Sequence, residues 1–238
     1  MKKISVVMPV YNEGEIIDKI ISEWEDFLKL LNIDYEIIIC EDGSTDQTKD
    51  KLSKIFNLNK RIINNCVEYR RGYGRAVISG IQISKSEHIL CIDSDGQCDP
   101  KNLVEFIKEV KNNDFVIGWR KPRKDRKIRL IYSFLFKCLH DILFNSKLND
   151  PSCPFIIIKK SFFLEIEHLL LDVKEAFWWA FVGAAIQNKA KYNQIAINHR
   201  ERMAGETQVY QINKMPLIII RNIYSLIKIK FIKPIHSS

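Results

Sequence analysis

The sequence predicts an α/β fold, with a Rossmann-like, mostly parallel β-sheet flanked by helices. Short β-branched runs alternate with amphipathic segments of helical length along the 238 residues. The runs are continuously apolar, as in Ile37-Ile38-Ile39, which is typical of strands buried on both faces. Hydrophobic residues make up 46% of the chain and charged residues 28%, a balance that favours a folded globular domain over a disordered chain.

The pattern places seven strands and seven helices in alternation. Strands are expected over residues 4–8, 35–40, 62–67, 88–92, 115–118, 155–158 and 194–197. Helices are expected over residues 15–31, 47–56, 75–85, 100–111, 128–144, 160–170 and 174–188. Among the boundaries, Asp99 reads as a helix N-cap followed by Pro100 at the first helical position. We expect one domain over residues 1–213 and a separate C-terminal segment over 214–238.

The C-terminal segment is rich in Ile, and Arg221, Lys228 and Lys230 interrupt it, so an amphipathic helix with a basic edge is expected. Such a helix either packs on the domain or lies in a membrane interface, and the sequence leaves both open. No segment is expected to span a bilayer, because the longest uncharged apolar stretch, 176–186, is about half of the ~20 residues required.

Charge and cysteine usage restrict the partners and the compartment. The net charge is +8, and seven Lys or Arg against one Asp lie between Arg120 and Arg129. Such a cluster indicates either an anion-facing patch or a solvated loop. The six cysteines form no Cys-x-x-Cys pair, and no signal-peptide pattern precedes the first strand, so we expect a reducing, cytoplasmic setting.

Acidic side chains follow three of the predicted strands, and the basic cluster follows another strand. Glu13, Asp42 and the triplet Asp93-Ser94-Asp95 come after the first, second and fourth strands, and Arg120 follows the fifth. Ligands of parallel α/β sheets bind outside the carboxyl ends of the strands. Acids and bases that meet at one edge predict a site for a metal ion and an anion.

Asp93 and Asp95 are the candidate metal ligands, because carboxylate oxygens suit Mg²⁺ or Mn²⁺. The cation would bridge two phosphate oxygens and stabilise a departing nucleoside diphosphate. An isolated Asp-x-Asp also occurs in turns and helix caps. Local roles are open for the other strand ends too, with Asn12 and Glu13 as caps of the next helix and Ser44 and Asp46 as turn and cap residues. The position of the triplet beside the other acidic strand ends is what favours a metal site.

A glycine-containing loop, Arg71-Gly72-Tyr73-Gly74, resembles a dinucleotide-binding loop but lacks the third glycine. It also follows the third strand, whereas in NAD-dependent oxidoreductases such a loop follows the first. An oxidoreductase is therefore disfavoured.

Taken together, these strings resemble family 2 glycosyltransferases of the GT-A fold. They are Pro9-Val-Tyr-Asn-Glu13, Glu41-Asp42-Gly-Ser-Thr-Asp46, Gly72-Tyr-Gly74 and Asp93-Ser-Asp95-Gly-Gln97. The second half is similar to the polyprenyl-phosphate sugar synthase branch, through Gly118-Trp-Arg120, the Arg-rich stretch to Arg129, Asp150-Pro-Ser-Cys-Pro-Phe155 and the segment from Asn198 to Thr207.

The resemblance implies a role for each matching position. Nucleotide binding falls to Pro9, Tyr11, Glu13, Asp42 and Ser94; metal binding falls to Asp93, Asp95 and Gln97; and the catalytic and phosphate-holding set is Asp95, Arg120, Arg129 and Arg202. Arginine suits phosphate because its planar fork binds two oxygens at once. One departure is that Gln208 stands where relatives often have Lys after Gly-Glu-Ser.

These features predict an inverting, metal-dependent transferase that moves a sugar from GDP-mannose or a UDP-sugar to a polyprenyl phosphate. A hydroxyl acceptor needs a general base, whereas a lipid phosphate is already anionic. The region around Glu175, Trp178 and Trp179 lacks the Glu-Asp pair of relatives that act on hydroxyls, although Glu175 remains a candidate base. The two tryptophans fit either a membrane interface or an aromatic core.

Two alternatives stay open: transfer to a hydroxyl of a cell-surface glycan, and a basic membrane- or nucleic-acid-binding module without catalysis. The second leaves the acids at the strand ends unexplained. For the leading reading we expect peripheral contact with the inner face of the cytoplasmic membrane, a role in cell-envelope biosynthesis and no nucleic-acid partner.

Overall fold

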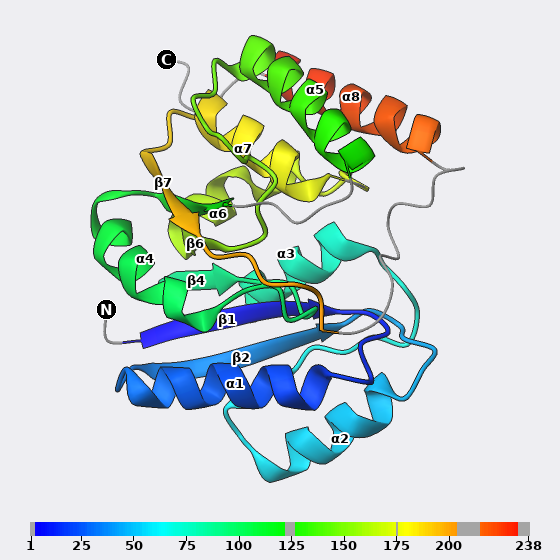
Figure 1. Cartoon of the computed structure of the whole chain (residues 1–238), viewed down its shortest axis with the longest axis vertical. Helices are drawn as coiled ribbons and strands as arrows, with labels where there is room; N and C mark the ends of the chain where they lie inside the picture. The colour runs from blue at the N-terminus through cyan, green and yellow to red at the C-terminus, as the bar shows by residue number, and fades with distance from the viewer. Residues whose placement is uncertain (1–2, 122–126, 175, 204–214, 233–238) are drawn as a thin grey trace.

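A computed structural model describes residues 3–121, 127–174, 176–203 and 215–232. For residues 127–129 and 215–217 it describes the backbone, and for the other described residues it also describes the side chains. In these residues the chain forms a seven-stranded sheet with helices on both sides (Figure 1). The α/β architecture expected from the sequence is confirmed.

The strands are β1 (Lys3–Val10), β2 (Asp34–Glu41), β3 (Ile62–Asn64), β4 (His88–Cys91), β5 (Phe115–Arg120), β6 (Ile156–Lys159) and β7 (Tyr192–Ile197). They lie in the order β3-β2-β1-β4-β6-β5-β7. β6 runs antiparallel to β4 and β5, and the other strand pairings are parallel. Apart from β6, the strands therefore present their carboxyl ends at one edge of the sheet, which we call the carboxyl edge.

The helices are α1 (Ile17–Leu30), α2 (Thr48–Leu58), α3 (Tyr73–Ile83), α4 (Leu103–Glu109), α5 (Lys127–Phe144), α6 (Lys160–Ile166), α7 (Phe177–Gln187) and α8 (Met215–Phe231). In Figure 1, α1 and α2 lie below the sheet, whereas α7, α5 and α8 lie above it. α5 and α8 contact each other and both contact α7, so they form the outer layer of that side.

Several expected elements differ in extent by a few residues, and three of these differences have a clear local reason. β3 ends at Asn64, whose side-chain Oδ1 accepts a hydrogen bond of 2.9 Å from the Cys66 backbone N–H and turns the chain. The helix expected over 100–111 is split, because single 3₁₀ turns flank α4 at both ends. α7 begins after Ala176, whose φ of 52° is left-handed and therefore outside helical geometry.

The strands and α7 supply much of the core. Cys40 and Cys91 are fully buried in β2 and β4, as expected for small apolar side chains. Trp178 and Trp179 are only 5% and 7% exposed, so the membrane-interface reading of these two side chains is wrong and the aromatic-core reading is confirmed.

The C-terminal segment packs on the domain through α8, whose Ile218, Leu226 and Ile229 are buried. The expected boundary between residues 213 and 214 lies in 204–214, outside the described residues. None of the helices in the described part of the chain is long and apolar enough to cross a membrane.

Candidate active site at the carboxyl edge of the sheet

The loops after β1 and β2 are fastened to each other. Asn12 adopts φ 55°, a conformation in which Asn is enriched, and its Oδ1 accepts a hydrogen bond of 2.9 Å from the Thr45 backbone N–H. Asp46 accepts from the backbone N–H groups of Gly14 and Thr48, at 3.0 Å each. Asp46 therefore has the turn role expected for it, whereas Asn12 binds the loop after β2 and does not cap α1, whose N-cap residue is Ile16. These contacts hold the chain on both sides of Glu13.

Glu13 is 7% exposed and accepts a hydrogen bond from Nη2 of Arg202, which lies 189 residues later in the chain. The other terminal nitrogen of Arg202, Nη1, lies 3.6 Å from Oδ2 of Asp95. Burial raises the pKa of Glu13 to about 7, against the opposing charge of Arg202, and the charges of Asp95 and Asp93 add to the rise. One guanidinium thus bridges two acids from different strand ends.

The segment that carries Arg202 lies along the loop after β4. The backbone N–H of Arg200 donates to Gln97 O at 3.1 Å, and that of Met203 donates to Asp95 O at 3.3 Å. Arg200 itself pairs with Glu23 at 2.6 Å and with Asp99 at 2.9 Å. These contacts bring residues 198–203 to the metal-ligand candidates, which sequence spacing alone does not do.

Asp93 is held by an aromatic pair. The Tyr73 hydroxyl donates to Asp93 Oδ1 at 2.8 Å, and Trp178 Nε1 donates to the Tyr73 oxygen at 2.8 Å. Burial and the neighbouring Asp95 carboxylate raise the pKa of Asp93. An extra positive charge at this point would stabilise both ionised carboxylates.

The other residues of the triplet region are tied to their neighbours. The Ser94 hydroxyl donates to the Pro9 carbonyl oxygen at 2.9 Å and so joins the ends of β4 and β1. Asp95 Oδ1 accepts from the Gln97 backbone N–H at 3.0 Å. The Gln97 side-chain amide donates to Arg200 O at 3.3 Å, so it faces residues 198–203.

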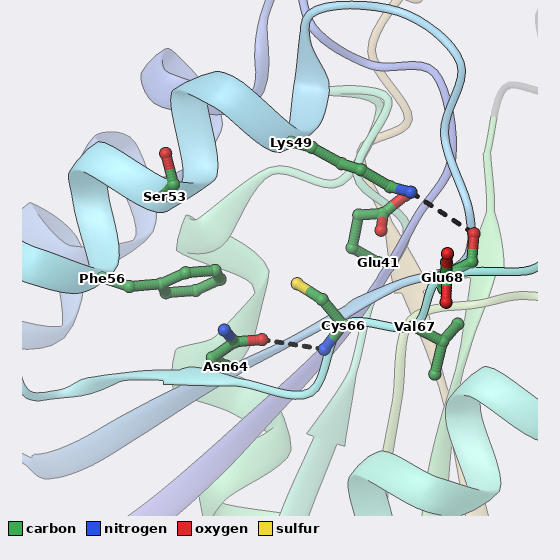
Figure 2. Close-up of a pocket in the computed structure, with 8 residues that line it drawn as sticks. All are labelled: Glu41, Lys49, Ser53, Phe56, Asn64, Cys66, Val67 and Glu68. Carbon is green, nitrogen blue, oxygen red and sulfur yellow. Dashed lines mark hydrogen bonds between the residues drawn. The ribbon is translucent and has the colours of Figure 1, made fainter.

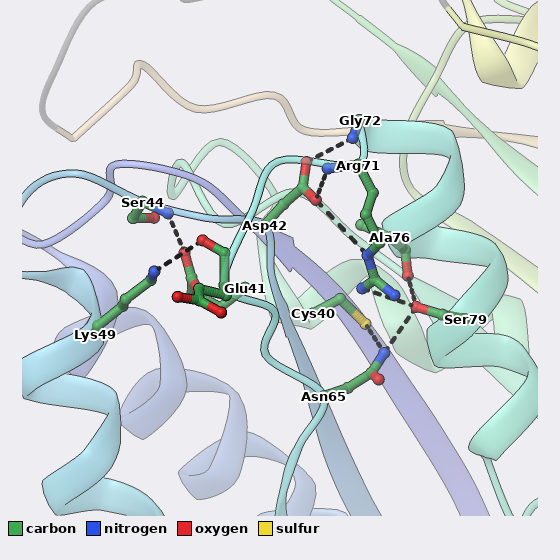
Figure 3. A network of polar contacts seen from close by, with 11 residues as sticks. Cys40, Glu41, Asp42, Ser44, Lys49, Asn65, Arg71, Gly72, Ala76 and Ser79 are labelled. Atoms are coloured by element: carbon green, nitrogen blue, oxygen red, sulfur yellow. Dashed lines mark hydrogen bonds and ion pairs between the residues drawn. The ribbon is translucent and has the colours of Figure 1, made fainter.

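Asp42 binds the backbone at the start of α3, as Figure 3 shows. Its two carboxylate oxygens accept from the N–H groups of Arg71 and Gly72, at 2.7 and 2.8 Å. The neighbouring Arg70 guanidinium stacks over the Tyr11 ring, 3.8 Å from its centroid. Tyr11 and Asp42, both expected to bind nucleotide, therefore both contact the loop before α3.

Arg120, expected to hold phosphate, is buried in an ion pair with Asp150. Arg120 Nε and Nη2 donate to the two Asp150 oxygens at 2.7 and 2.9 Å, and Nη2 also donates to Ser152 at 2.9 Å. The side chains of Arg120 and Asp150 are 7% and 1% exposed. The Arg129 side chain and Glu175 lie outside the described residues, so their expected roles stay predictions.

Two cavities adjoin this edge of the sheet. The larger, about 500 Å³, lies between the start of α3 and residues 171–174, and its lining includes Arg70, Arg71, Arg75 and Lys174. The smaller, about 240 Å³, lies between α2 and the chain after β3 (Figure 2), and its lining includes Glu41, Lys49 and Cys66. The larger cavity is basic and therefore suits an anionic group.

The Asp93 and Asp95 carboxylates fit a cation that takes its remaining ligands from water and from a substrate. Among the described residues, no three His, Cys, Asp or Glu side chains come together as a complete metal site. Asp93 and Asp95 nevertheless offer two carboxylates at the end of β4, and the Arg202 charge already lies close to one of them. A hard divalent cation commonly completes such a set with water and phosphate oxygens.

The structure thus brings together Glu13, Asp93, Asp95 and Arg202, and it adds residues without a predicted role. Tyr73 and Trp178 orient Asp93, Arg70 covers Tyr11, and Asp150 neutralises Arg120. Tyr73 and Asp150 both stood in strings quoted for the family resemblance, which was the available signal. For Trp178 the sequence predicted only an interface or core position, and its contact with Tyr73 was not predictable because the two residues are 105 apart in the chain.

Comparisons with known proteins identify relatives along most of the chain. The chain is 26% identical over 223 residues to the dodecaprenyl-phosphate galacturonate synthase of Rhizobium johnstonii, covering 92% of this chain and 64% of the relative. It is also 26% identical over 219 residues to the undecaprenyl-phosphate 4-deoxy-4-formamido-L-arabinose transferase of Yersinia enterocolitica, covering 90% and 64%. The chain thus spans a little under two thirds of the length of these relatives.

Solved structures share the fold. The glucosyl-3-phosphoglycerate synthase of Mycobacterium tuberculosis, in complex with Mn²⁺, UDP-glucose and phosphoglyceric acid, superposes with a TM-score of 0.69 at 17% identity, covering 98% of this chain and 81% of that one. The mannosyl-3-phosphoglycerate synthase of Rubrobacter xylanophilus gives 0.66 at 13% identity, covering 95% and 73%. These neighbours support the GT-A architecture.

The model of the family described as glycosyl transferase family 2 matches residues 5–166. The match runs from β1 to the end of α6 and includes Glu13, Asp42, Asp93 and Asp95. The chain therefore belongs to glycosyltransferase family 2.

Proposed function

We propose that the protein is an inverting glycosyltransferase that moves a sugar from a nucleotide-sugar donor to a polyprenyl phosphate, with a divalent cation at Asp93 and Asp95. The observation that carries the proposal is the convergence of Glu13, Asp93, Asp95 and Arg202 at the carboxyl edge of a family 2 domain. The names of both relatives contain a polyprenyl phosphate, which supports the acceptor class.

Each group has a task in this scheme. The cation would stabilise the negative charge of the leaving nucleoside diphosphate. Arg202 would turn from the acids toward phosphate oxygens once the cation occupies the carboxylates, because its planar fork suits phosphate. Tyr11 and Asp42 would hold the nucleoside, in the place expected for ligands of parallel sheets.

The acceptor needs no general base if it is a phosphate, since it is anionic at neutral pH. The basic lining of the larger cavity is compatible with an anionic acceptor or donor group. A polyprenyl phosphate lies in a membrane, so peripheral contact with the inner face of the cytoplasmic membrane and a role in cell-envelope biosynthesis belong to the same proposal.

The donor site is tested by calorimetry of UDP and GDP binding with Mn²⁺ present and after chelation. Wild-type protein is expected to bind one of the two in a Mn²⁺-dependent way, and Asp95→Ala is expected to abolish this binding. Asp26→Ala on α1 is the matched control, because Asp26 is 74% exposed and far along the helix from the site. Unchanged binding in Asp95→Ala contradicts the metal site.

The acceptor is tested by incubating the protein with GDP-mannose and a panel of UDP-sugars, together with short-chain polyprenyl phosphates or oligosaccharides. Product on the polyprenyl phosphate supports the proposal. Product only on sugar hydroxyls replaces it with the glycan alternative, and Mn²⁺-independent binding of nucleic acid without any transfer would replace it with the binding-module alternative.

A further inference from the structure

The outer faces of α5 and α8 carry an unusual share of the exposed apolar surface. Sixteen large apolar side chains are exposed in the described part of the chain, and eight of them lie on these two helices. Single exposed apolar residues are normal on a protein surface, but a concentrated set indicates an interaction surface.

On α5 the exposed positions form one stripe. Between residues 130 and 144 the exposed residues are Ile131, Phe134, Leu135, Cys138 and Ile142, and none of them is charged. Their spacing of three, four, seven and eleven residues puts them on one side of the helix. By contrast, the exposed positions of α1 are Asp18, Lys19, Ser22, Asp26, Lys29 and Leu30.

On α8 a second stripe has the same period. Ile220, Tyr224, Ile227 and Phe231 are 64%, 68%, 41% and 81% exposed, and they lie four, seven and eleven residues from the first. The opposite face of α8 is buried against the domain. Because α5 and α8 contact each other and form the outer layer, we call the two stripes together the apolar double stripe.

The charges beside the double stripe are positive. The sequences of α5 and α8 together contain six Lys or Arg against one acid, Asp141, which is paired with Lys137 at 2.6 Å. Lys228 of α8 is paired with Asp172 at 2.8 Å, and the balance of the two helices remains positive. In the sequence just before α5, residues 121–126 add four more Lys or Arg against one Asp. An apolar face flanked by Lys and Arg matches an anionic lipid interface, where the apolar side chains enter the acyl boundary and the cations meet headgroups.

We propose that the apolar double stripe docks on a bilayer containing anionic phospholipid, with α5 and α8 lying in the plane of the interface. In Figure 1 both helices begin on the side toward which the arrowheads of β1 and β2 point, so the docked bilayer would adjoin the carboxyl edge. Docking would bring the phosphate of a lipid-linked acceptor near the site, and this role of the surface rests on the proposed function.

Vesicle flotation with the full chain tests the docking surface. The protein is expected to float with vesicles of phosphatidylcholine mixed with phosphatidylglycerol, less with phosphatidylcholine alone, and less at high salt. The double variant Phe134→Asp with Tyr224→Asp is expected to lower vesicle binding by about tenfold or more, because two apolar side chains lose their lipid contact.

Leu58→Asp is the matched control, because Leu58 is 88% exposed on α2, at the opposite end of the molecule in Figure 1. It is expected to bind vesicles as the wild type does. All of the altered side chains are exposed, and equal melting temperatures will show that the variants are folded. Equal losses in the control and in the double variant overturn the proposal.

A fluorophore on Cys138 gives a second readout. Cys138 is the exposed cysteine of the α5 stripe, Cys66 is half-buried and can be replaced by Ser, and the other four cysteines are buried. An environment-sensitive label at Cys138 is expected to shift to the blue on anionic vesicles. No shift, or a wild-type chain that does not float, overturns the proposal.

A second copy of the chain is the competing occupant, and sedimentation velocity distinguishes it. A dimer that the double variant converts to monomer, together with absent vesicle binding, overturns the bilayer proposal. The vesicles contain neither donor nor polyprenyl phosphate, so vesicle binding is independent of sugar transfer. Docking without transfer would contradict the proposed function alone, and transfer to a water-soluble short-chain acceptor without docking would contradict the surface alone.

Discussion

The hydroxyl of Tyr73 donates a hydrogen bond of 2.8 Å to Oδ1 of Asp93. Tyr73 in turn accepts from the Trp178 indole, so its hydroxyl hydrogen is directed at the carboxylate. A partner of this kind fixes the orientation of a metal-binding carboxylate. The relationship joins the start of α3 and the start of α7 to the end of β4.

Removing the Tyr73 hydroxyl is expected to weaken the cation site. In Tyr73→Phe, Asp93 loses its orienting donor, and we expect Mn²⁺ affinity in the presence of UDP or GDP to fall by about 10- to 100-fold. Calorimetry measures this change. Tyr69→Phe is the control, because Tyr69 is 76% exposed, and an equal effect in both variants would show that the Asp93 contact is unimportant.

Arg202→Gln is expected to lower kcat/KM for transfer by about 10²- to 10³-fold, the range seen when one group that stabilises transition-state charge is removed. The reason is that Arg202 is the cation held between Glu13 and Asp95. Steady-state kinetics with the donor and acceptor that the transfer assay selects measure the effect.

Arg200→Gln provides the comparison for Arg202, because Arg200 belongs to the same segment but pairs with Glu23 and Asp99. A much smaller loss of activity is expected there. Comparable losses in the two variants would mean that anchoring of residues 198–203, and not the Arg202 charge, is what transfer requires.

Asp150→Asn is expected to destabilise the fold by about 3–5 kcal/mol, because it removes the carboxylate charge that binds the buried Arg120 guanidinium. Denaturant unfolding measures the change. Asp172→Asn breaks the pair between Asp172 and Lys228, whose side chains are 78% and 47% exposed, respectively. Little change in the unfolding free energy is expected for this variant. If both variants unfold at the same denaturant concentration, the buried pair is not stabilising.

The unfolding free energy is expected to fall as the pH falls from about 6.5 toward 4, through His140. Burial lowers the pKa of His140 from 6.5 to about 4, and its Nε2 lies 3.2 Å from the Trp179 carbonyl oxygen. Between pH 4 and pH 6.5 the unfolded chain binds a proton at His140 that the folded chain does not. The stabilising contribution of neutral His140 is therefore fully present above pH 6.5 and is lost as the pH falls toward 4. The loss is on the order of 3 kcal/mol.

His140→Gln keeps a side-chain N–H donor and does not titrate, so its unfolding free energy is expected to depend less on pH in this window. Urea unfolding at a series of pH values measures the slope. His168→Gln, at an exposed position, serves as the control. A slope in His140→Gln equal to that of the wild type would assign the pH dependence to other groups.

The positions of β1, β2, β4, β5 and β6 were predictable from the sequence, because each is a local, mostly apolar run whose residues are almost all buried. The antiparallel direction of β6 was not, because direction depends on a pairing with β4, more than sixty residues earlier. The length of β3 was also missed, since the Asn64 turn depends on one side-chain contact.

The sequence by itself determined the fold class, the strand ends that carry Glu13, Asp42, Asp93 and Asp95, and the family resemblance, since these depend on local patterns and fixed spacings. Only the tertiary structure decided that Arg202 pairs with Glu13 and Asp95, that Arg120 pairs with Asp150, and that α5 and α8 share one outer surface. Those contacts join residues far apart in the chain, and packing of the sheet and helices, which no local pattern encodes, brings them together.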